Sequence, residues 1–312
     1  MTPRLALLCS GQGGQHASMF ELARSDPASA GLLAQLLDPW LAATLPGLSL
    51  PEVLQDQDLL FSNRLAQPLI VAATAAIWSA LQAQLPPPEL VAGYSIGELA
   101  AWHVAGAMSA PQAIALAHAR AQLMDACLLP GSPQVLFAVS GIALRPLAAL
   151  LASQQLHVAI ETDADSCIAG GLQQDLPGAA AEIERQGGKI TLLPVTVASH
   201  TPLMAAAVAP FAQQLKQQLS RDPSLPLLSG LDARILTRKE QAIETLSRQL
   251  AHTIRWNACM DACAERGITA ALELGPGAAL SRMLAARHPH IACRSASEFR
   301  SLQGIVNWLQ RL

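Results

Sequence analysis

Apolar positions along this chain alternate between short continuous runs and helical spacing, and the pattern predicts a mixed α/β fold. Residues 5–9 (LALLC) are apolar at every position, which is typical of a strand buried on both faces. A long apolar pattern over 66–83 predicts a helix, with Pro68 near its start, where proline is tolerated. Three more elements are expected before residue 130: a strand at 89–92 and helices at 96–106 and from Ser109 to about Cys127.

The pattern changes at about residue 133, where short strands and helices begin to alternate. The predicted order is strand, helix, strand, strand, helix, strand, at 134–140, 144–154, 156–161, 166–170, 176–187 and 189–197. This is the ferredoxin-like order. We therefore expect an inserted ferredoxin-like subdomain at 132–198 within a discontinuous large α/β domain formed by 1–131 and 199–312. After residue 200 the pattern predicts long helices and one more strand at 269–274.

Composition and charge narrow the classes of protein. Of 312 residues, 51% are hydrophobic and 14% are charged, which favours a compact globular protein over a disordered one. The net charge of −3 gives no general attraction to nucleic acid or to an anionic membrane, and neither is expected as a partner. The uncharged run 99–119 comes nearest to a membrane span in length, but it holds two His, a Pro, a Gln and a Ser.

The six cysteines do not form a metal site or a redox pair by their spacing. None belongs to a Cys-x-x-Cys motif, and no metal is expected. Cys259 and Cys263 would share one helix face, which is typical of small buried side chains. The apolar run 5–9 is too short for a secretory signal. Free thiols without such a segment predict a cytoplasmic protein.

Gly93-Tyr94-Ser95-Ile96-Gly97 is the first candidate for chemistry. Glycine and serine are common turn residues, so the stretch can be an ordinary turn. It also follows a predicted strand and opens a predicted helix, which is the context of a serine nucleophile on a sharp turn. The free N–H groups at the helix start would lie beside Ser95. The context favours the nucleophile.

A nucleophilic serine needs a base, and His200 is the candidate. No local spacing distinguishes it from the seven other histidines, and a lone histidine is more often structural. Its position decides: it lies where the chain leaves the predicted small subdomain and re-enters the large one. Sites tend to form at such junctions.

Arg120 is the only charged residue between Glu98 and Asp125. A guanidinium in so apolar a helix needs an anion or a route to water, because an unpaired buried charge is costly. A salt bridge to Glu98 or Asp125 would satisfy it structurally. Alternatively, its planar fork could hold the carboxylate of a substrate. The pattern alone favours the salt bridge.

The loop Gly11-Gln12-Gly13-Gly14-Gln15 follows the first strand. It matches neither a phosphate-binding loop nor the Gly-x-Gly-x-x-Gly dinucleotide motif. A glycine-rich loop can bring backbone N–H groups close to a ligand. It would suit the second donor of an oxyanion hole, whose first donor would be Ile96, next to Ser95.

Six ordered motifs together resemble the malonyl-CoA:acyl carrier protein transacylase family, which includes the acyltransferase domains of fatty acid and polyketide synthases. They span nearly the whole chain: Gly11–Gln15, Gly93–Glu98, Arg120–Met124, Ser199–Met204, Gln249 with Ile254–Trp256, and Glu273–Gly277. The resemblance implies an α/β-hydrolase-like large domain with a ferredoxin-like insert. It also implies that malonyl-CoA is a substrate, that an acyl carrier protein is the partner, and that no cofactor is tightly bound.

The resemblance assigns roles to six residues. It implies that Ser95 is acylated and that His200 is the base, oriented by the backbone carbonyl of Gln249 rather than by an acid. The backbone N–H groups of Gln12 and Ile96 would form the oxyanion hole. Arg120 would bind the free carboxylate of the malonyl group, which reverses the preference drawn from the pattern alone.

One departure from the family pattern concerns the residue before the nucleophile, which is usually His and here is Tyr94. The stretch Gly93–Trp102 (GYSIGELAAW) is similar to the epsilon subunit of malonate decarboxylase, a malonyltransferase that loads a specialised carrier subunit. This predicts a malonyltransferase subunit of malonate decarboxylase, with that enzyme's other subunits as partners. Malonyl loading for fatty acid or polyketide synthesis is the alternative. Methylmalonyl is not excluded, because one methyl group changes binding by only about 1–3 kcal/mol.

Two alternatives belong to other classes. A serine esterase or thioesterase would need an acid between Ser95 and a near-terminal His, whereas 112 residues follow His200. A non-catalytic carrier-docking subunit would need none of Ser95, His200 and Arg120. An acidic carrier would need a basic surface, for which Arg234, Arg238 and Lys239 are candidates, although a solvated face explains these residues better.

Overall fold

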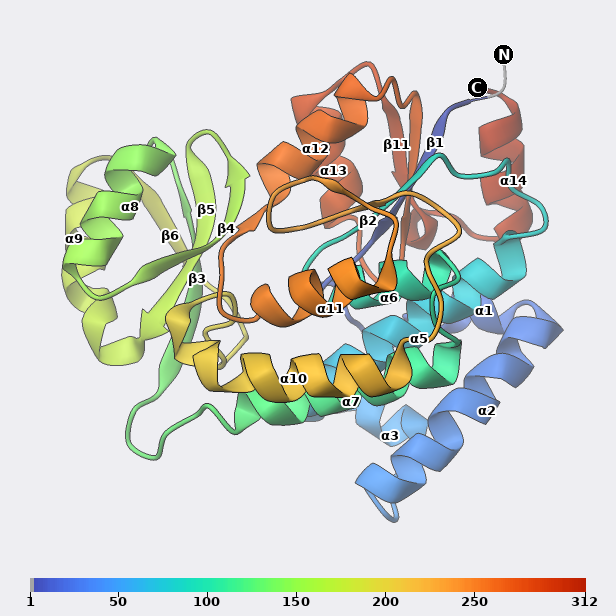
Figure 1. Ribbon diagram of the computed structural model, residues 1–312, viewed down its shortest axis with the longest axis horizontal. Coiled ribbons are helices and arrows are strands. Elements are labelled where there is room, and N and C mark those ends of the chain that lie inside the picture. The colour runs from blue at the N-terminus through green and yellow to red at the C-terminus, as the bar shows by residue number, and fades with distance from the viewer. Residues whose placement is uncertain (1–2) are drawn as a thin grey trace.

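A computed structural model describes residues 3–312, and its strands form two sheets that lie side by side (Figure 1). The first has the order β11-β10-β1-β2-β7-β8 and the second the order β6-β3-β5-β4-β9. In Figure 1 the strands β3 to β6 of the second sheet, with α8 and α9 on their outer side, form the green unit apart from the rest of the helices. The protein is therefore mixed α/β, as the hydrophobic pattern predicts.

The first sheet is mainly parallel, with β1 at its centre. β1 (Leu5–Cys9) pairs in parallel with β10 (Ala270–Leu274) and β2 (Leu90–Gly93). These three strands are buried at every position, because helices cover both faces of the sheet. The remaining strands lie outside them: β11 (Ala292–Ser295) pairs with β10, β7 (Leu227–Leu228) with β2, and β8 (Ile235–Leu236) with β7.

Alternate residues of β1 enter different cores. Leu5, Leu7 and Cys9 belong to the larger core with α2, α5, α6, α7 and α10, whereas Ala6 and Leu8 belong to a core with α12 and α13. The helices of this part are α1 (Glu21–Arg24), α2 (Pro27–Thr44), α3 (Leu50–Gln55), α4 (Gln57–Phe61), α5 (Asn63–Leu81), α6 (Ile96–Val104), α7 (Ala110–Asp125), α10 (Ala205–Gln218), α11 (Lys239–Arg248), α12 (Trp256–Glu265), α13 (Ala279–Arg287) and α14 (Leu302–Gln310).

The sequence pattern makes 99–119 the nearest approach to a membrane span, but the helix that is long and apolar enough by length and composition is α5. In the structure α5 is core: most of it is buried, and it packs against α2, α6 and α7. The run 99–119 does not form one helix. It is divided between α6 and α7 by a turn at Ala105–Ser109, where Ser109 caps the second helix.

The second sheet has the element order predicted from the sequence. β3 (Gln134–Ser140), α8 (Leu144–Ser153), β4 (His157–Asp163), β5 (Ser166–Leu172), α9 (Leu176–Arg185) and β6 (Lys189–Leu192) follow one another, and the four strands pair antiparallel. Helices α8 and α9 cover one face through a small core of their own. Leu136, Ala159 and Ile160 on the other face join the core that contains Leu8 and α12.

Two predictions about strands are wrong. The strand expected at 189–197 ends at Leu192, and residues 193–197 form irregular chain that leads to His200. One strand was expected after residue 200, but the structure has five. Four were missed: β7, β8 and β9 (Ile254–Arg255) have two residues each, too few to show a period, and the fourth is β11, which has four. β9 pairs in parallel with β4, so the C-terminal part of the chain completes the second sheet.

Candidate active site

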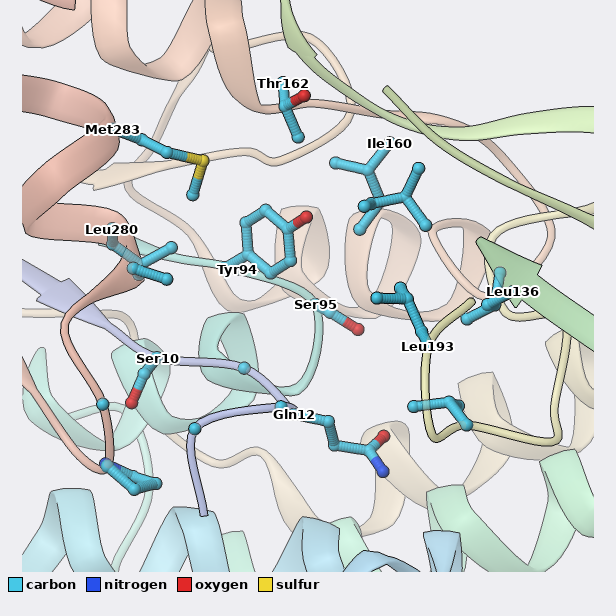
Figure 2. Close-up of a pocket in the computed structure, with 18 of the residues that line it drawn as sticks. Ser10, Gln12, Tyr94, Ser95, Leu136, Ile160, Thr162, Leu193, Leu280 and Met283 are labelled. Atoms are coloured by element: carbon cyan, nitrogen blue, oxygen red, sulfur yellow. The ribbon is translucent and has the colours of Figure 1, made fainter. Parts of the chain in front are cut away.

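Ser95 lies on a sharp turn between the end of β2 and the start of α6. Its backbone has φ 57° and ψ −118°, a strained conformation for a residue with a side chain. A Cβ at Gly93 would collide with the backbone of Gly97 and Glu98, and a Cβ at Gly97 would collide with the carbonyl of Cys9 at the end of β1. Both glycines are therefore required for close backbone approach, and the turn exposes the Ser95 side chain to the pocket (Figure 2).

His200 meets Ser95 although 105 residues separate them. Its Nε2 is 2.7 Å from the Ser95 Oγ. The ring Nδ1 lies 2.5 Å from the backbone carbonyl of Gln249, and the His200 backbone N–H donates to the carbonyl of Leu250 at 2.7 Å. Because a carbonyl only accepts, Nδ1 carries the proton and Nε2 is free to accept the Ser95 hydroxyl proton.

The surroundings of His200 keep its ring neutral. Burial lowers the pKa of His200 to about 3, and the positive charge of Arg120 acts in the same direction, while the bond to Gln249 opposes them. A neutral imidazole at neutral pH has the lone pair that a general base needs.

The side chain of Gln249 forms a second link, which sequence reasoning missed. Its Nε2 donates to Glu98 Oε2 at 3.1 Å, and the backbone N–H of Gly230 donates to the same oxygen at 3.0 Å. Glu98 lies on α6, the helix that begins after Ser95. The two residues are 151 positions apart, and no local pattern in the sequence could have paired them.

Arg120 lies on α7 beside Ser95, with its Nη2 3.5 Å from the Ser95 Oγ. The residue is 2% exposed, and its Nη1 donates to Gln67 Oε1 at 2.7 Å. Neither predicted salt bridge forms: within residues 3–312, no carboxylate makes an ion pair with this guanidinium. Burial lowers the pKa of Arg120 to about 9, against the attraction of Glu98, so the group stays charged at neutral pH.

Gln67 is a second residue that sequence reasoning missed. It is fully buried on α5, and its Nε2 donates to Asn63 Oδ1 at 2.5 Å. Asn63 Nδ2 donates in turn to Asp125 Oδ1 at 2.8 Å. This relay fixes the guanidinium of Arg120 through neutral amides. A single Gln in the apolar stretch QPLIVAAT would have been the only signal.

The two predicted oxyanion donors lie near Ser95: Ile96 follows it in the chain, and Gln12 lines the same pocket as Ser95. Within the described residues, the backbone N–H groups of Gln12 and Ile96 make no hydrogen bond to protein atoms. Ile96 is the first residue of α6, so its N–H points out of the helix. Figure 2 shows Gln12 in the loop after β1, on the opposite side of Ser95 from Tyr94.

A pocket of about 620 Å³ opens between the two sheets, and Ser95 and His200 line it. Its walls are mainly apolar: Leu136, Ile160 and Leu193 come from the second sheet and the chain after β6, and Leu280 and Met283 from α13 (Figure 2). Tyr94 forms part of the wall. Its ring packs edge-on against Trp256, with 5.3 Å between the ring centroids, and burial raises the pKa of its phenol.

Other candidates from the sequence lie outside this pocket. Cys259 and Cys263 are buried together on α12. Arg234 forms ion pairs with Asp232 and Glu244, so part of the suggested basic surface is already neutralised. Among the residues that the structure describes, no cluster of His, Cys, Asp or Glu is arranged to hold a metal ion.

Known proteins share both the sequence pattern and the fold. Residues 6–297 match the family model of the acyl transferase domain. The malonyl CoA-acyl carrier protein transacylase of Mycobacterium tuberculosis is 29% identical over 307 residues, which cover 97% of this chain and 99% of that protein. The polyketide synthase GfsB of Streptomyces halstedii is 31% identical over 289 residues, which cover 89% of this chain and 5% of that protein.

Solved structures show the same architecture. FabD from Acinetobacter baumannii superimposes with a TM-score of 0.90 at 26% identity, covering 100% of this chain and 99% of that one. The malonyl-CoA:acyl carrier protein transacylase of Xanthomonas oryzae gives a TM-score of 0.88 at 26% identity, covering 99% of both chains.

Proposed function

This chain belongs to the acyl transferase domain family, and we propose that it transfers a malonyl group from malonyl-CoA to the phosphopantetheine-type thiol of an acyl carrier protein. The reaction would pass through a malonyl ester on Ser95. Support comes from the Ser95–His200 pair, from the full-length similarity to malonyl-CoA transacylases and from Arg120.

The surroundings of Arg120 are the main support for malonyl as the acyl group. A buried guanidinium without a carboxylate partner, 3.5 Å from the Ser95 Oγ, leaves donors free beside the nucleophile. A malonyl group joined to Ser95 has one free carboxylate a short distance from the ester. The planar fork of arginine binds such a carboxylate by two hydrogen bonds. A neutral acyl group would leave the charge unpaired.

The first half-reaction uses Ser95 as nucleophile and His200 as base. Nε2 takes the hydroxyl proton while the Oγ attacks the thioester carbon, and the carbonyl oxygen becomes an oxyanion. The backbone N–H groups of Gln12 and Ile96 would stabilise that oxyanion. When the tetrahedral species collapses, the carbon–sulfur bond breaks, the CoA sulfur takes the proton from His200, and malonyl-Ser95 remains.

The second half-reaction runs the same steps with the thiol of the carrier. His200 takes the thiol proton, the sulfur attacks the ester carbon, and the Ser95 oxygen leaves with the proton. Water in the pocket would hydrolyse the ester, so the apolar lining from the second sheet and α13 protects the intermediate. No step needs a bound cofactor.

The carrier that accepts the malonyl group would serve one of two pathways. Loading a carrier for fatty acid or polyketide synthesis is the better supported role, because the similar proteins include free-standing transacylases and a polyketide synthase. The malonate decarboxylase role predicted from Gly93–Trp102 rests on that stretch alone. The esterase alternative is weakened because His200 is held by a backbone carbonyl and not by an acid.

The arrangement of the chain supports the predicted domains. We propose that 1–131 and 199–312 form the hydrolase-like catalytic domain and that 132–198 form the ferredoxin-like insert, because β3 to β6 and their two helices have a core of their own. A cytoplasmic location remains a proposal that rests on the six free cysteines.

A transfer assay tests the function. The protein is mixed with malonyl-CoA and a phosphopantetheinylated acyl carrier protein, and the intact mass of the carrier is followed. We expect the carrier to gain one malonyl group, with acetyl-CoA giving far less product and Ser95→Ala giving none. If every acyl carrier protein tried stays unmodified while malonyl-CoA is hydrolysed, the result would favour the esterase.

A further inference from the structure

Glu98 and Gln249 form a buried pair behind the catalytic residues. Glu98 is 0% exposed and Gln249 is 1% exposed. One bond joins them, from Gln249 Nε2 to Glu98 Oε2. Two buried oxygens of this same pair, Oε1 of Glu98 and Oε1 of Gln249, have no hydrogen-bond partner within the described residues. Leaving two buried acceptors unsatisfied is costly, at about 1–3 kcal/mol each.

A single proton satisfies both oxygens. An ionised carboxylate and an amide oxygen are both acceptors only, so they cannot bond to each other. A protonated carboxyl group has one O–H donor. If Glu98 carries its proton on Oε1, the acid and the amide can face each other through two parallel bonds: N–H of Gln249 to Oε2, and O–H of Glu98 to the Oε1 of Gln249.

Turning the amide of Gln249 over does not solve the problem without a proton. The amide oxygen would then face Glu98 Oε2, which already accepts the N–H of Gly230, and two acceptors would meet. An N–H group of Gln249 would then lie where its Oε1 now lies, but the amide oxygen and Glu98 Oε2 would still meet as two acceptors. In the orientation that the structure shows, a proton on Glu98 Oε1 would supply the one donor that the two unpartnered oxygens lack.

Three charged or titratable groups face Glu98 from neighbouring elements. Arg120 on α7 favours the ionised form, whereas Asp232, in the loop after β7, favours the protonated form. The buried thiol of Cys259 on α12 also senses Glu98. Burial dominates and raises the pKa of Glu98 to about 8. No ion pair reaches its carboxyl group within residues 3–312.

We propose that Glu98 is a neutral positioning residue, whose carboxyl proton is donated to the side chain of Gln249 and thereby fixes the residue that holds His200. The consequence for catalysis rests on the proposed function. A closed ring of contacts results: Ser95 starts α6, α6 carries Glu98, Glu98 holds Gln249, Gln249 holds His200, and His200 meets Ser95. Ionisation of Glu98 opens the ring at one bond.

The decisive variant is Glu98→Gln, because an amide at this position can still donate to Gln249 and accept from Gly230 but cannot ionise. We expect kcat/KM for malonyl transfer of the wild type to fall above a midpoint near pH 8. E98Q should keep the neutral-pH value within about twofold and should lose this alkaline fall. Glu98→Leu, which removes both bonds, should lower kcat about tenfold with little change in KM.

Asp232→Asn is the control variant that tests whether the alkaline midpoint belongs to Glu98. Removing the negative charge of Asp232 makes ionisation of Glu98 easier, so the alkaline midpoint should move to lower pH, by a few tenths of a unit for an exposed charge. The same substitution in the E98Q background should have no effect on the profile. A midpoint that moves equally in both backgrounds would assign the alkaline fall to another group and overturn the proposal.

Infrared spectroscopy reads the proton without relying on activity. The difference spectrum between wild type and E98Q at pH 6.5 should contain the C=O stretching band of a protonated carboxyl group, and that band should disappear as the pH rises past about 8. Absence of the band, or an E98Q enzyme with a raised KM for malonyl-CoA alone, would show that Glu98 is an anion balancing Arg120. This readout stands even if the protein forms no malonyl ester, so a failure of the proposed function is distinguished from a failure of this inference.

Discussion

Two buried polar networks flank Ser95, and they differ in whether their contacts close within the protein. On one side, Glu98, Gln249 and His200 form a neutral ring that returns to Ser95. On the other, the chain from Asp125 through Asn63 and Gln67 ends at Arg120, whose charge meets no carboxylate of the described residues. The closed network, formed by Glu98, Gln249 and His200, positions the catalytic groups. The open network, which ends at Arg120, has a cation that can bind an anion.

The difference follows from desolvation. Both networks lie in the core, where an uncompensated charge is expensive. The His200 side avoids that cost by staying neutral, since burial lowers the pKa of His200 and raises that of Glu98. The Arg120 side keeps its cation because the guanidinium remains protonated even when its pKa falls to about 9. A malonyl carboxylate would supply the missing charge, so substrate binding would complete the second network.

Breaking the open network at its end should have the largest effect. Arg120→Ala removes the partner of the malonyl carboxylate, and kcat/KM for malonyl-CoA should fall by about 100-fold, a loss of about 3 kcal/mol. Activity with acetyl-CoA should be kept or increased. Steady-state kinetics with both thioesters measures this, and an equal loss for both would remove Arg120 from its role as carboxylate clamp.

A change one residue back should have an intermediate effect. Gln67→Leu leaves the guanidinium of Arg120 without its buried acceptor, and we expect kcat/KM for malonyl-CoA to fall about tenfold through KM. Gln67→Glu should raise KM further, because its carboxylate would pair with Arg120 in place of the substrate. Both variants are assayed against acetyl-CoA, whose kinetics should change little.

Asp125→Asn serves as the control for Gln67. It lies at the half-buried end of the relay, and an amide oxygen there can still accept from Asn63. The expected change is less than about twofold. A loss as large as that of Gln67→Leu would mean that the relay acts by its charge and not by holding Arg120 in place.

The acid side of the pH profile tests the closed network, and the expected effect there is the smallest. Because the folded pKa of His200 is lowered to about 3, the ring stays neutral as the pH falls through 6.5. Single-turnover formation of malonyl-Ser95 should therefore change by less than about twofold between pH 7 and pH 5. An acid limb centred near 6.5 would show that His200 is solvated and not held as described.

The lowered pKa of His200 should also make the free energy of unfolding decrease as the pH falls. A histidine whose folded pKa is lower than its unfolded value of 6.5 binds fewer protons in the folded state. Its contribution to the free energy of unfolding is complete above pH 6.5 and declines as the pH falls from there toward 3, by at most about 1.4 kcal/mol per unit.

Some of the site could be predicted from the sequence because its physical signals are local. The serine between two glycines indicates a sharp turn, and the structure shows both glycines in close backbone contact. Arg120 is conspicuous because it is the only charged residue between Glu98 and Asp125. The order of strands and helices from 134 to 185 could be predicted because each of β3, α8, β4, β5 and α9 has seven to ten residues, long enough to show its period.

The missed features depend on contacts between distant parts of the chain. Gln67 lies in an apolar helix and gains a role only where α5 packs against α7. Glu98 and Gln249 are 151 positions apart and meet only in the folded chain. Only the structure shows that each has an oxygen without a hydrogen-bond partner among the described residues. Neither salt bridge that the pattern alone favoured for Arg120 forms, because the order of residues along the chain does not fix the direction of a side chain.

The most direct test of the central claim is the intact mass of the protein after brief mixing with malonyl-CoA, beside acetyl-CoA and beside Ser95→Ala. We predict a mass increase of one malonyl group with malonyl-CoA, much less adduct with acetyl-CoA, and no adduct on the Ser95→Ala variant. Release of free CoA without any adduct, or an adduct that persists in Ser95→Ala, would contradict the account.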